Sequence, residues 1–125
     1  MNSGRAAAFA TLKIILAKHA NRLAVRADTS AEYTLTAKSP SPFPEHKGHP
    51  LEFASVRISK SYVSFHLMPV YMNSALGQTI SPLLQKRMQG KTCFNFRNEP
   101  EPGLIAEISA LTEAALRDWS QKQWV

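Results

Sequence analysis

Two strand-like runs joined by a short polar connection decide the fold, and they lie within residues 51–68, LEFASVRISKSYVSFHLM. The connection, residues 59–61, is short enough that an antiparallel hairpin is the simplest way to pair the two runs. In the second run Val63, Phe65 and Leu67 fall on one side, because side chains alternate across a strand. The other side carries Tyr62, Ser64, His66 and Met68. We therefore expect a sheet with one apolar face and one mixed face.

Helices are expected before and after this hairpin. Apolar residues recur at helical spacing within residues 1–27, and again within residues 104–119. Between them, a serine followed by a proline predicts the start of a short basic helix at residues 81–82, which ends at Gly90. The first stripe consists of Phe9, Leu12, Ile15, Leu16, His19 and Leu23, and the last of Leu104, Ile108, Leu111, Ala115 and Trp119.

Two more strands complete the predicted sheet, at residues 32–36 and 92–96, where apolar and polar residues alternate. In the second of these, Thr92, Phe94 and Phe96 share one side, and Cys93 and Asn95 share the other. The element order αβββαβα predicts a single α+β domain over residues 1–125, with an antiparallel sheet of about four strands packed against helices. Residues 37–50 are rich in proline and are predicted to be a loop, either a lid or a linker.

Composition excludes several classes of protein. The chain has 125 residues, of which 44% are hydrophobic and 19% charged, as expected of a folded domain with one core. Its longest uncharged stretch, residues 61–86, is interrupted by polar residues and prolines and does not read as a membrane span. The net charge of +6 favours anionic partners. Cys93 is the only cysteine, which excludes an intramolecular disulfide and indicates a reducing, cytoplasmic setting.

The N-terminal residues allow a second interpretation. Residues 1–27 contain five basic residues and no acid, which is also typical of a transit peptide. The continuous apolar stripe favours a core helix instead, since a small core needs those residues.

Three motifs that suggest chemistry are incomplete. A phosphate-binding loop at Gly90 would need a second glycine where the chain has Gln85, and a strand before it rather than a helix. His46 and His49 alone do not complete a metal site, which would require Glu45 or a distant residue. We therefore predict no metal and no cofactor, and His19 is interpreted as a hydrogen-bonded residue at the core boundary.

A cysteine nucleophile is the third incomplete motif. Cys93 and His66 are both placed on strands, where they can face the same side of the sheet. A reactive thiol needs a lowered pKa and a base within hydrogen-bond reach, whereas a buried cysteine behaves as a small hydrophobic residue. An enzyme is therefore the least favoured function.

Basic residues gather near the short helix and the last strand. They offer contacts to a phosphate, a carboxylate or a nucleic-acid backbone, although an ordinary solvated face is the simpler interpretation. Phe94 and Phe96 are better explained as core residues than as platforms for stacked bases. The basic residues are Lys86, Arg87, Lys91 and Arg97.

Two blocks of sequence carry a family resemblance: residues 62–71, YVSFHLMPVY, and residues 80–96, ISPLLQKRMQGKTCFNF. Through them the chain resembles the YdhG-like family of small bacterial proteins of unknown function. The resemblance implies a small α+β fold, and the label of some members implies a frataxin-like iron chaperone. Iron delivery of that type relies on an acidic helical surface, whereas this chain has no acid before Asp28 and a net charge of +6.

We therefore predict a non-enzymatic binding module. Its site is the mixed sheet face with two residues at the rim, and its ligand is a small anion or a second subunit that forms a homodimer. The predicted site residues are Ser64, His66, Met68, Cys93 and Asn95 on the face, with Tyr71 and Lys91 at the rim. An iron chaperone and an electrostatic nucleic-acid binder are the alternatives.

Overall fold

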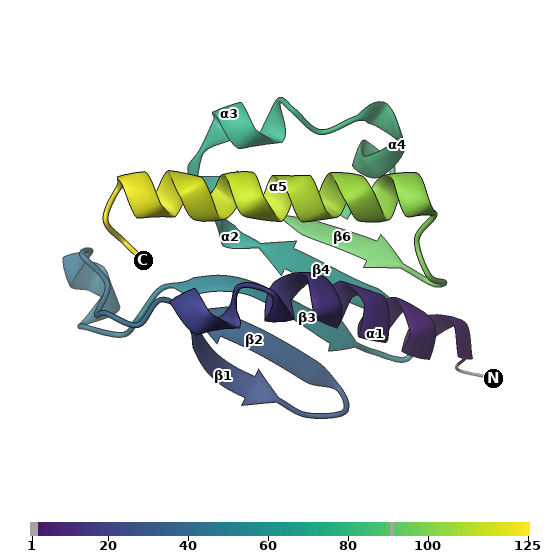
Figure 1. The fold of residues 1–125 in the computed structure, drawn as a ribbon, viewed down its shortest axis with the longest axis horizontal. Helices are drawn as coiled ribbons and strands as arrows, with labels where there is room; N and C mark the ends of the chain where they lie inside the picture. Colours follow the sequence, from purple (N-terminus) through teal and green to yellow (C-terminus); the bar gives the residue numbers. More distant parts are fainter. Residues whose placement is uncertain (1–2, 91) are drawn as a thin grey trace.

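The computed structural model describes residues 3–90 and 92–125, and it shows an antiparallel sheet packed against helices (Figure 1). The strands are β1 (Ala24–Asp28), β2 (Glu32–Thr36), β3 (Glu52–Ile58), β4 (Val63–Leu67), β5 (Met88–Gln89) and β6 (Cys93–Phe96). The α-helices are α1 (Ser3–Ala17), α2 (Met68–Met72), α3 (Ser74–Gly77), α4 (Pro82–Gln85) and α5 (Pro102–Gln121), and two 3-10 helices are η1 (Ala20–Arg22) and η2 (Pro44–His46). The predicted α+β class is confirmed.

The sheet has the strand order β1-β2-β3-β4-β6-β5, and every neighbouring pair is antiparallel. The predicted hairpin is β3 and β4, in which Val56 pairs with Phe65 and Ile58 pairs with Val63. Its turn is closed by a hydrogen bond from the Ser59 amide to the Tyr62 carbonyl at 2.8 Å. Strand β4 ends before Pro69, which lies in the first turn of α2 and has no N–H to donate to a ladder.

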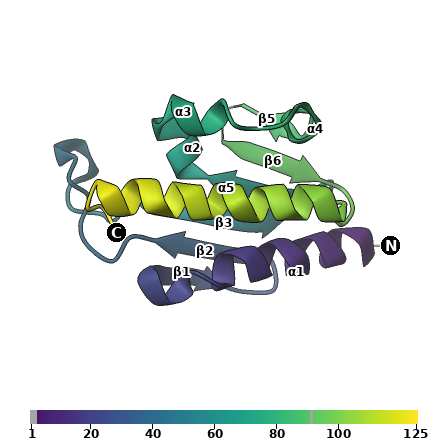
Figure 2. The same ribbon diagram turned by 45° about the horizontal axis from the view of Figure 1, so that its top comes forward.

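Helices α1 and α5 lie across the same face of the sheet and contact each other (Figures 1 and 2). Beneath them, the predicted apolar face is confirmed, since Val63, Phe65, Leu67 and Phe94 are fully buried and Phe96 is nearly so. All five residues of the predicted stripe on α5 are also buried. The core therefore lies between the two long helices and one face of the sheet, which leaves the mixed face of β4 and β6 outside it.

The predicted first helix is too long. The observed helix, α1, ends at Ala17. After η1 the chain enters β1, a strand that the sequence pattern did not predict. Leu23 is buried as expected, but it follows η1 rather than lying on the helix. The physical reason is that residues 24–28 gain a ladder of hydrogen bonds with β2, and this pairing outweighs a local helical spacing.

The predicted second helix is also too long. Helix α4 ends at Gln85, and residues 88–89 form the short edge strand β5 against β6, so the sheet has six strands rather than about four. Ser81 caps α4 as predicted, because its hydroxyl accepts a hydrogen bond from the Leu84 amide at 3.2 Å. Gly90 has φ +74°, so it adopts the predicted left-handed conformation, but between β5 and β6 rather than at a helix end.

Aromatic side chains pack the proline-rich segment, residues 37–50, against the C-terminal end of α5. Phe43 meets Trp124 edge to face with ring centroids 5.4 Å apart, and Trp124 meets Trp119 in the same way at 5.6 Å. Trp119 in turn contacts Phe53 of β3 at 5.4 Å. Each such contact stabilises its pair beyond simple burial. The segment is therefore docked on the core through Phe43.

Across residues 3–90 and 92–125, no helix combines the length and the apolar character that a membrane crossing needs.

Candidate functional site

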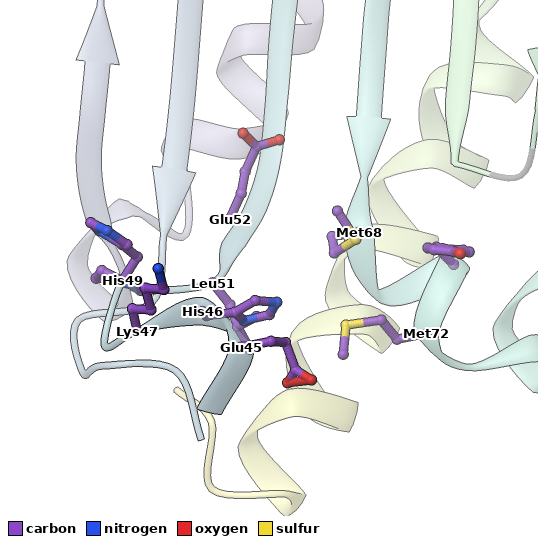
Figure 3. A pocket seen from close by; sticks show the side chains of 10 residues that line it. Glu45, His46, Lys47, His49, Leu51, Glu52, Met68 and Met72 are labelled. Atoms are coloured by element: carbon purple, nitrogen blue, oxygen red, sulfur yellow. The ribbon is translucent and has the colours of Figure 1, made fainter. Parts of the chain in front are cut away.

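A groove of about 770 Å³ lies between the proline-rich segment and α2, at the start of β3 (Figure 3). The segment contributes Glu45, His46 and Lys47 to it, and α2 contributes Met68, Tyr71 and Met72. The volume is in the range of small-molecule sites, and a mainly apolar wall with a few polar groups is typical of them. This groove is the candidate site.

A β-bulge brings Glu52 to the groove. Thr36 pairs with Glu52 and Leu35 pairs with Ala54, so Phe53 is an extra residue in β3. Strict alternation would place Glu52 on the core side with Ala54. The bulge lets Phe53 enter the core, where it is fully buried, and turns Glu52 to the mixed face. One local irregularity thus supplies both a core aromatic and a carboxylate of the site.

Glu52 is held by two positively charged or protonatable neighbours. Its Oε2 lies 3.2 Å from His66 Nδ1, and its Oε1 lies 3.7 Å from Arg57 Nη2. Arg57 also reaches Glu32 Oε2 at 3.4 Å, and that oxygen accepts a hydrogen bond from the Thr34 hydroxyl at 2.6 Å. These contacts form a chain of charges across β2, β3 and β4. The hydrogen bond with His66, followed by the charges of His66 and Arg57, lowers the pKa of Glu52 from its ordinary value of 4.5, although burial opposes this shift.

The lowered pKa predicts how Glu52 contributes to stability. A carboxyl whose pKa is lower in the folded state stabilises the fold above its unfolded-state pKa, and this stabilisation is lost as the pH falls through the folded-state value. We expect Glu52→Gln to lower the unfolding free energy at pH 7, and the difference from the wild type to shrink as the pH falls below about 4.5. Urea unfolding of the wild type and of Glu52→Gln between pH 7 and pH 3 measures this difference in unfolding free energy.

A matched variant is Glu45→Gln, which removes an exposed carboxylate from the same groove. Comparing the two variants separates the contacts of Glu52 from the general loss of one negative charge. A Glu52→Gln difference that stays constant over the whole pH range would contradict the proposed role of the His66 and Arg57 contacts.

The imidazole of His46 is fixed from two sides. Its Nδ1 lies 2.7 Å from the Ser41 hydroxyl, and its ring meets Phe43 edge to face at 5.5 Å. The residue lies at the end of η2, where its amide donates to the Phe43 carbonyl at 3.0 Å. Lys47 follows with φ 52°, a left-handed conformation that is uncommon for a lysine and turns the chain sharply. The segment therefore presents the remaining ring nitrogen, Nε2, to the groove side (Figure 3).

The structure divides the predicted site residues into two groups. Met68 and Tyr71 line the groove, and with His66 and Thr92 they also line an adjoining depression of about 410 Å³. Ser64 and Asn95 lie farther along the sheet, where the Ser64 hydroxyl donates to Asn95 Oδ1 at 2.8 Å. Lys91 lies outside the described residues.

Cys93 and His66 occupy opposite positions on β6 and β4, so they do share one face as predicted. The thiol is half-buried, and its Sγ lies 3.9 Å from the Thr92 hydroxyl. The Nδ1 of His66 contacts Glu52 instead of the thiol. The arrangement gives the imidazole a structural partner and does not assemble a thiol–imidazole pair.

Two of the predicted basic residues are engaged with neighbouring side chains. Arg87 lies over the ring of Phe96 at 5.9 Å and 4.0 Å from a Glu101 oxygen, and Arg97 lies over Tyr62 at 5.8 Å. These contacts are typical of a solvated face in which guanidinium groups cover aromatic rings.

Sequence reasoning did not place Lys47, Glu52 or Met72 in the site, nor did it find Ser41, which orients His46 from outside the groove. Met72 had a signal, since it lies four residues after Met68 and therefore on the same side of a helix, but α2 was not predicted. Among residues 3–90 and 92–125, no three His, Cys, Asp or Glu side chains come together in a way that would hold a metal ion.

No family model, curated protein or solved structure matches this chain.

Proposed function

We propose that the protein is a non-enzymatic binding module whose groove takes a small anionic ligand with an apolar body. The main support for this proposal is that one wall of the groove is polar and the other is mainly apolar. Lys47, two histidines and the exposed Glu45 lie on the side of the proline-rich segment, and α2 contributes Met68, Tyr71 and Met72. An amphipathic anion would place its charge on the first wall and its apolar body on the second.

The groove contains two carboxylates, Glu45 and Glu52, beside Lys47. The Glu52 carboxylate is already paired with His66 and Arg57, so it repels an anion less than a free carboxylate would. Tyr71 is 59% exposed, which is unusual for a large aromatic side chain and leaves apolar surface for a ligand. Methionines adapt to ligands of different shape because they are unbranched and polarisable.

The test uses the anionic dye 8-anilinonaphthalene-1-sulfonate, whose fluorescence rises in an apolar site, with octanoate as a competitor. We expect Lys47→Ala to remove a charge-assisted contact of about 1.5 kcal/mol, which weakens dye binding about tenfold. Lys60→Ala is the matched control, because Lys60 is an exposed lysine in the β3–β4 turn and not in the groove.

Two results would contradict the proposal. Equal losses at Lys47 and Lys60 would mean that the dye responds to net charge alone. Equal binding of the neutral analogue N-phenyl-1-naphthylamine would remove the preference for an anion. A sizing column reports in parallel whether His66→Glu converts a dimer into a monomer, which would favour a subunit interface on the mixed face instead.

The alternatives have less support. An iron chaperone would need carboxylate or histidine clusters, which the described residues do not assemble. A nucleic-acid binder would use basic side chains to reach phosphates, and near α4 and β6 two of them, Arg87 and Arg97, already lie over aromatic rings. Membership of the YdhG-like family is kept as a proposal that rests on residues 62–71 and 80–96.

A further inference from the structure

Two thioethers lie side by side on the groove wall formed by α2. Met68 and Met72 are one helical turn apart, and both line the groove. Both side chains are half-buried and pack against the hydrophobic core, which restricts their positions. Figure 3 shows them extending from one wall into the space that the His46 ring enters from the other.

A contact at Nδ1 orients the His46 ring and leaves Nε2 as the atom that could bind a metal ion. The Ser41 oxygen that lies 2.7 Å from Nδ1 also accepts a hydrogen bond from the Phe43 amide at 3.1 Å. A hydroxyl oxygen has two lone pairs, so it can accept from Nδ1–H as well. In that tautomer the lone pair of Nε2 is available to a metal ion. A hydrogen bond at the second ring nitrogen is the usual way in which proteins orient a ligating histidine.

We propose that His46, Met68 and Met72 bind a soft monovalent metal ion, Cu(I), in the groove. Thioether sulfur selects Cu(I) over harder ions, and imidazole nitrogen is also a good copper ligand. This set contains a single histidine and no carboxylate or thiolate, so it differs from a zinc or iron site. The proposal goes beyond the anionic ligand above and does not depend on it, because metal binding is measured without any organic molecule.

The surrounding charges are compatible with one positive charge. Glu45 also lines the groove, and its exposed carboxylate offsets the charge of Lys47 on the same wall as His46, whereas Glu52 is already paired with His66 and Arg57. Because Cu(I) carries a single charge, it needs less electrostatic compensation than a divalent ion. The net charge of +6 would slow the approach of any cation, but soft-ligand bonding, rather than long-range attraction, provides the affinity here.

The first experiment is a titration with Ag(I), a redox-inert analogue of Cu(I), followed by NMR of methyl-labelled methionine. All variants carry Cys93→Ser, because a free thiol binds both ions by itself. We expect the methyl signals of Met68 and Met72 to shift together and to saturate at one equivalent. Met88, which lies in β5 outside the groove, is the internal control and should not shift.

The second experiment measures Cu(I) affinity by anaerobic competition with bicinchoninate. We expect Met68→Leu, Met72→Leu and His46→Gln each to weaken binding by about tenfold or more, and Met88→Leu to leave it unchanged. The leucine substitutions nearly conserve volume, so the fold should persist, and far-ultraviolet circular dichroism verifies it. Ser41→Ala tests the positioning of His46 and should weaken Cu(I) about tenfold.

Three results would overturn the proposal: loss of all Ag(I) binding in the Cys93→Ser background, a shift of Met88 equal to those of Met68 and Met72, or unchanged Cu(I) affinity in His46→Gln. The first would assign the metal to the thiol, and the second would indicate unspecific thioether binding. A failure of dye binding with intact Cu(I) binding would reject the anionic ligand and leave the metal site standing.

Discussion

Replacing Phe65 or Phe94 with alanine is expected to cost about 3 to 5 kcal/mol of unfolding free energy each. The two residues pair directly across β4 and β6, and both are fully buried on the face covered by the helices. Each substitution loses the transfer free energy of a phenyl ring and leaves a cavity that the surrounding sheet cannot close. Urea unfolding monitored by circular dichroism measures both values.

The control for this pair is Lys60→Ala in the exposed β3–β4 turn, for which we expect a loss below about 0.5 kcal/mol. Comparable losses at Phe65, Phe94 and Lys60 would show that the assignment of the two sheet faces is wrong. Because the two phenylalanines share one region of the core, the double variant should lose less than the sum of the single losses.

The second large effect is expected at Trp119. This side chain is fully buried between Phe53 and Trp124, so Trp119→Ala should cost about 3 to 5 kcal/mol. It should also loosen the proline-rich segment, because Phe43 is docked on Trp124. Urea unfolding measures the first effect, and faster proteolytic cleavage within residues 37–50 under native conditions measures the second.

Trp119→Phe is the matched variant. The indole Nε1 is buried and has no hydrogen-bond partner among the described residues, so phenylalanine removes a polar group whose burial costs about 1 to 3 kcal/mol. This gain offsets part of the lost packing, and the variant should lose clearly less stability than Trp119→Ala. Equal losses in the two variants would contradict a stabilising contact of the Trp119 ring with Phe53 and Trp124.

The central hairpin and the last helix could be predicted because their burial follows one local period. Val63, Phe65 and Leu67 alternate with polar residues, and both flanking strands bury the same side. Strand β1 lacks such a pattern, since its five residues are exposed or half-buried at the edge of the sheet. Its strand conformation depends on pairing with β2, which the apolar spacing within residues 1–27 does not reveal.

The candidate site was only partly predictable for a similar reason. Met68 and Tyr71 follow β4 directly, so they could be placed near the mixed face from the hairpin alone. His46 reaches the groove because Phe43 docks on Trp124, a contact between residues 81 positions apart in the chain. Glu52 faces His66 because of the bulge at Phe53. Neither a long-range aromatic contact nor a bulge leaves a periodic signal in the sequence.

The bulge in β3 also constrains how this sequence can change in length during evolution or engineering. Deleting Glu52 would restore regular alternation and turn the phenyl ring of Phe53 to the groove side, whereas deleting Phe53 would keep Glu52 on the mixed face and remove a buried ring from the core. An insertion within residues 37–50 leaves the frame of β3 intact, since that frame is set by the ladder with β4. We therefore expect changes in length to be tolerated within residues 37–50, whereas Glu52 and Phe53 must both be present to keep the bulge.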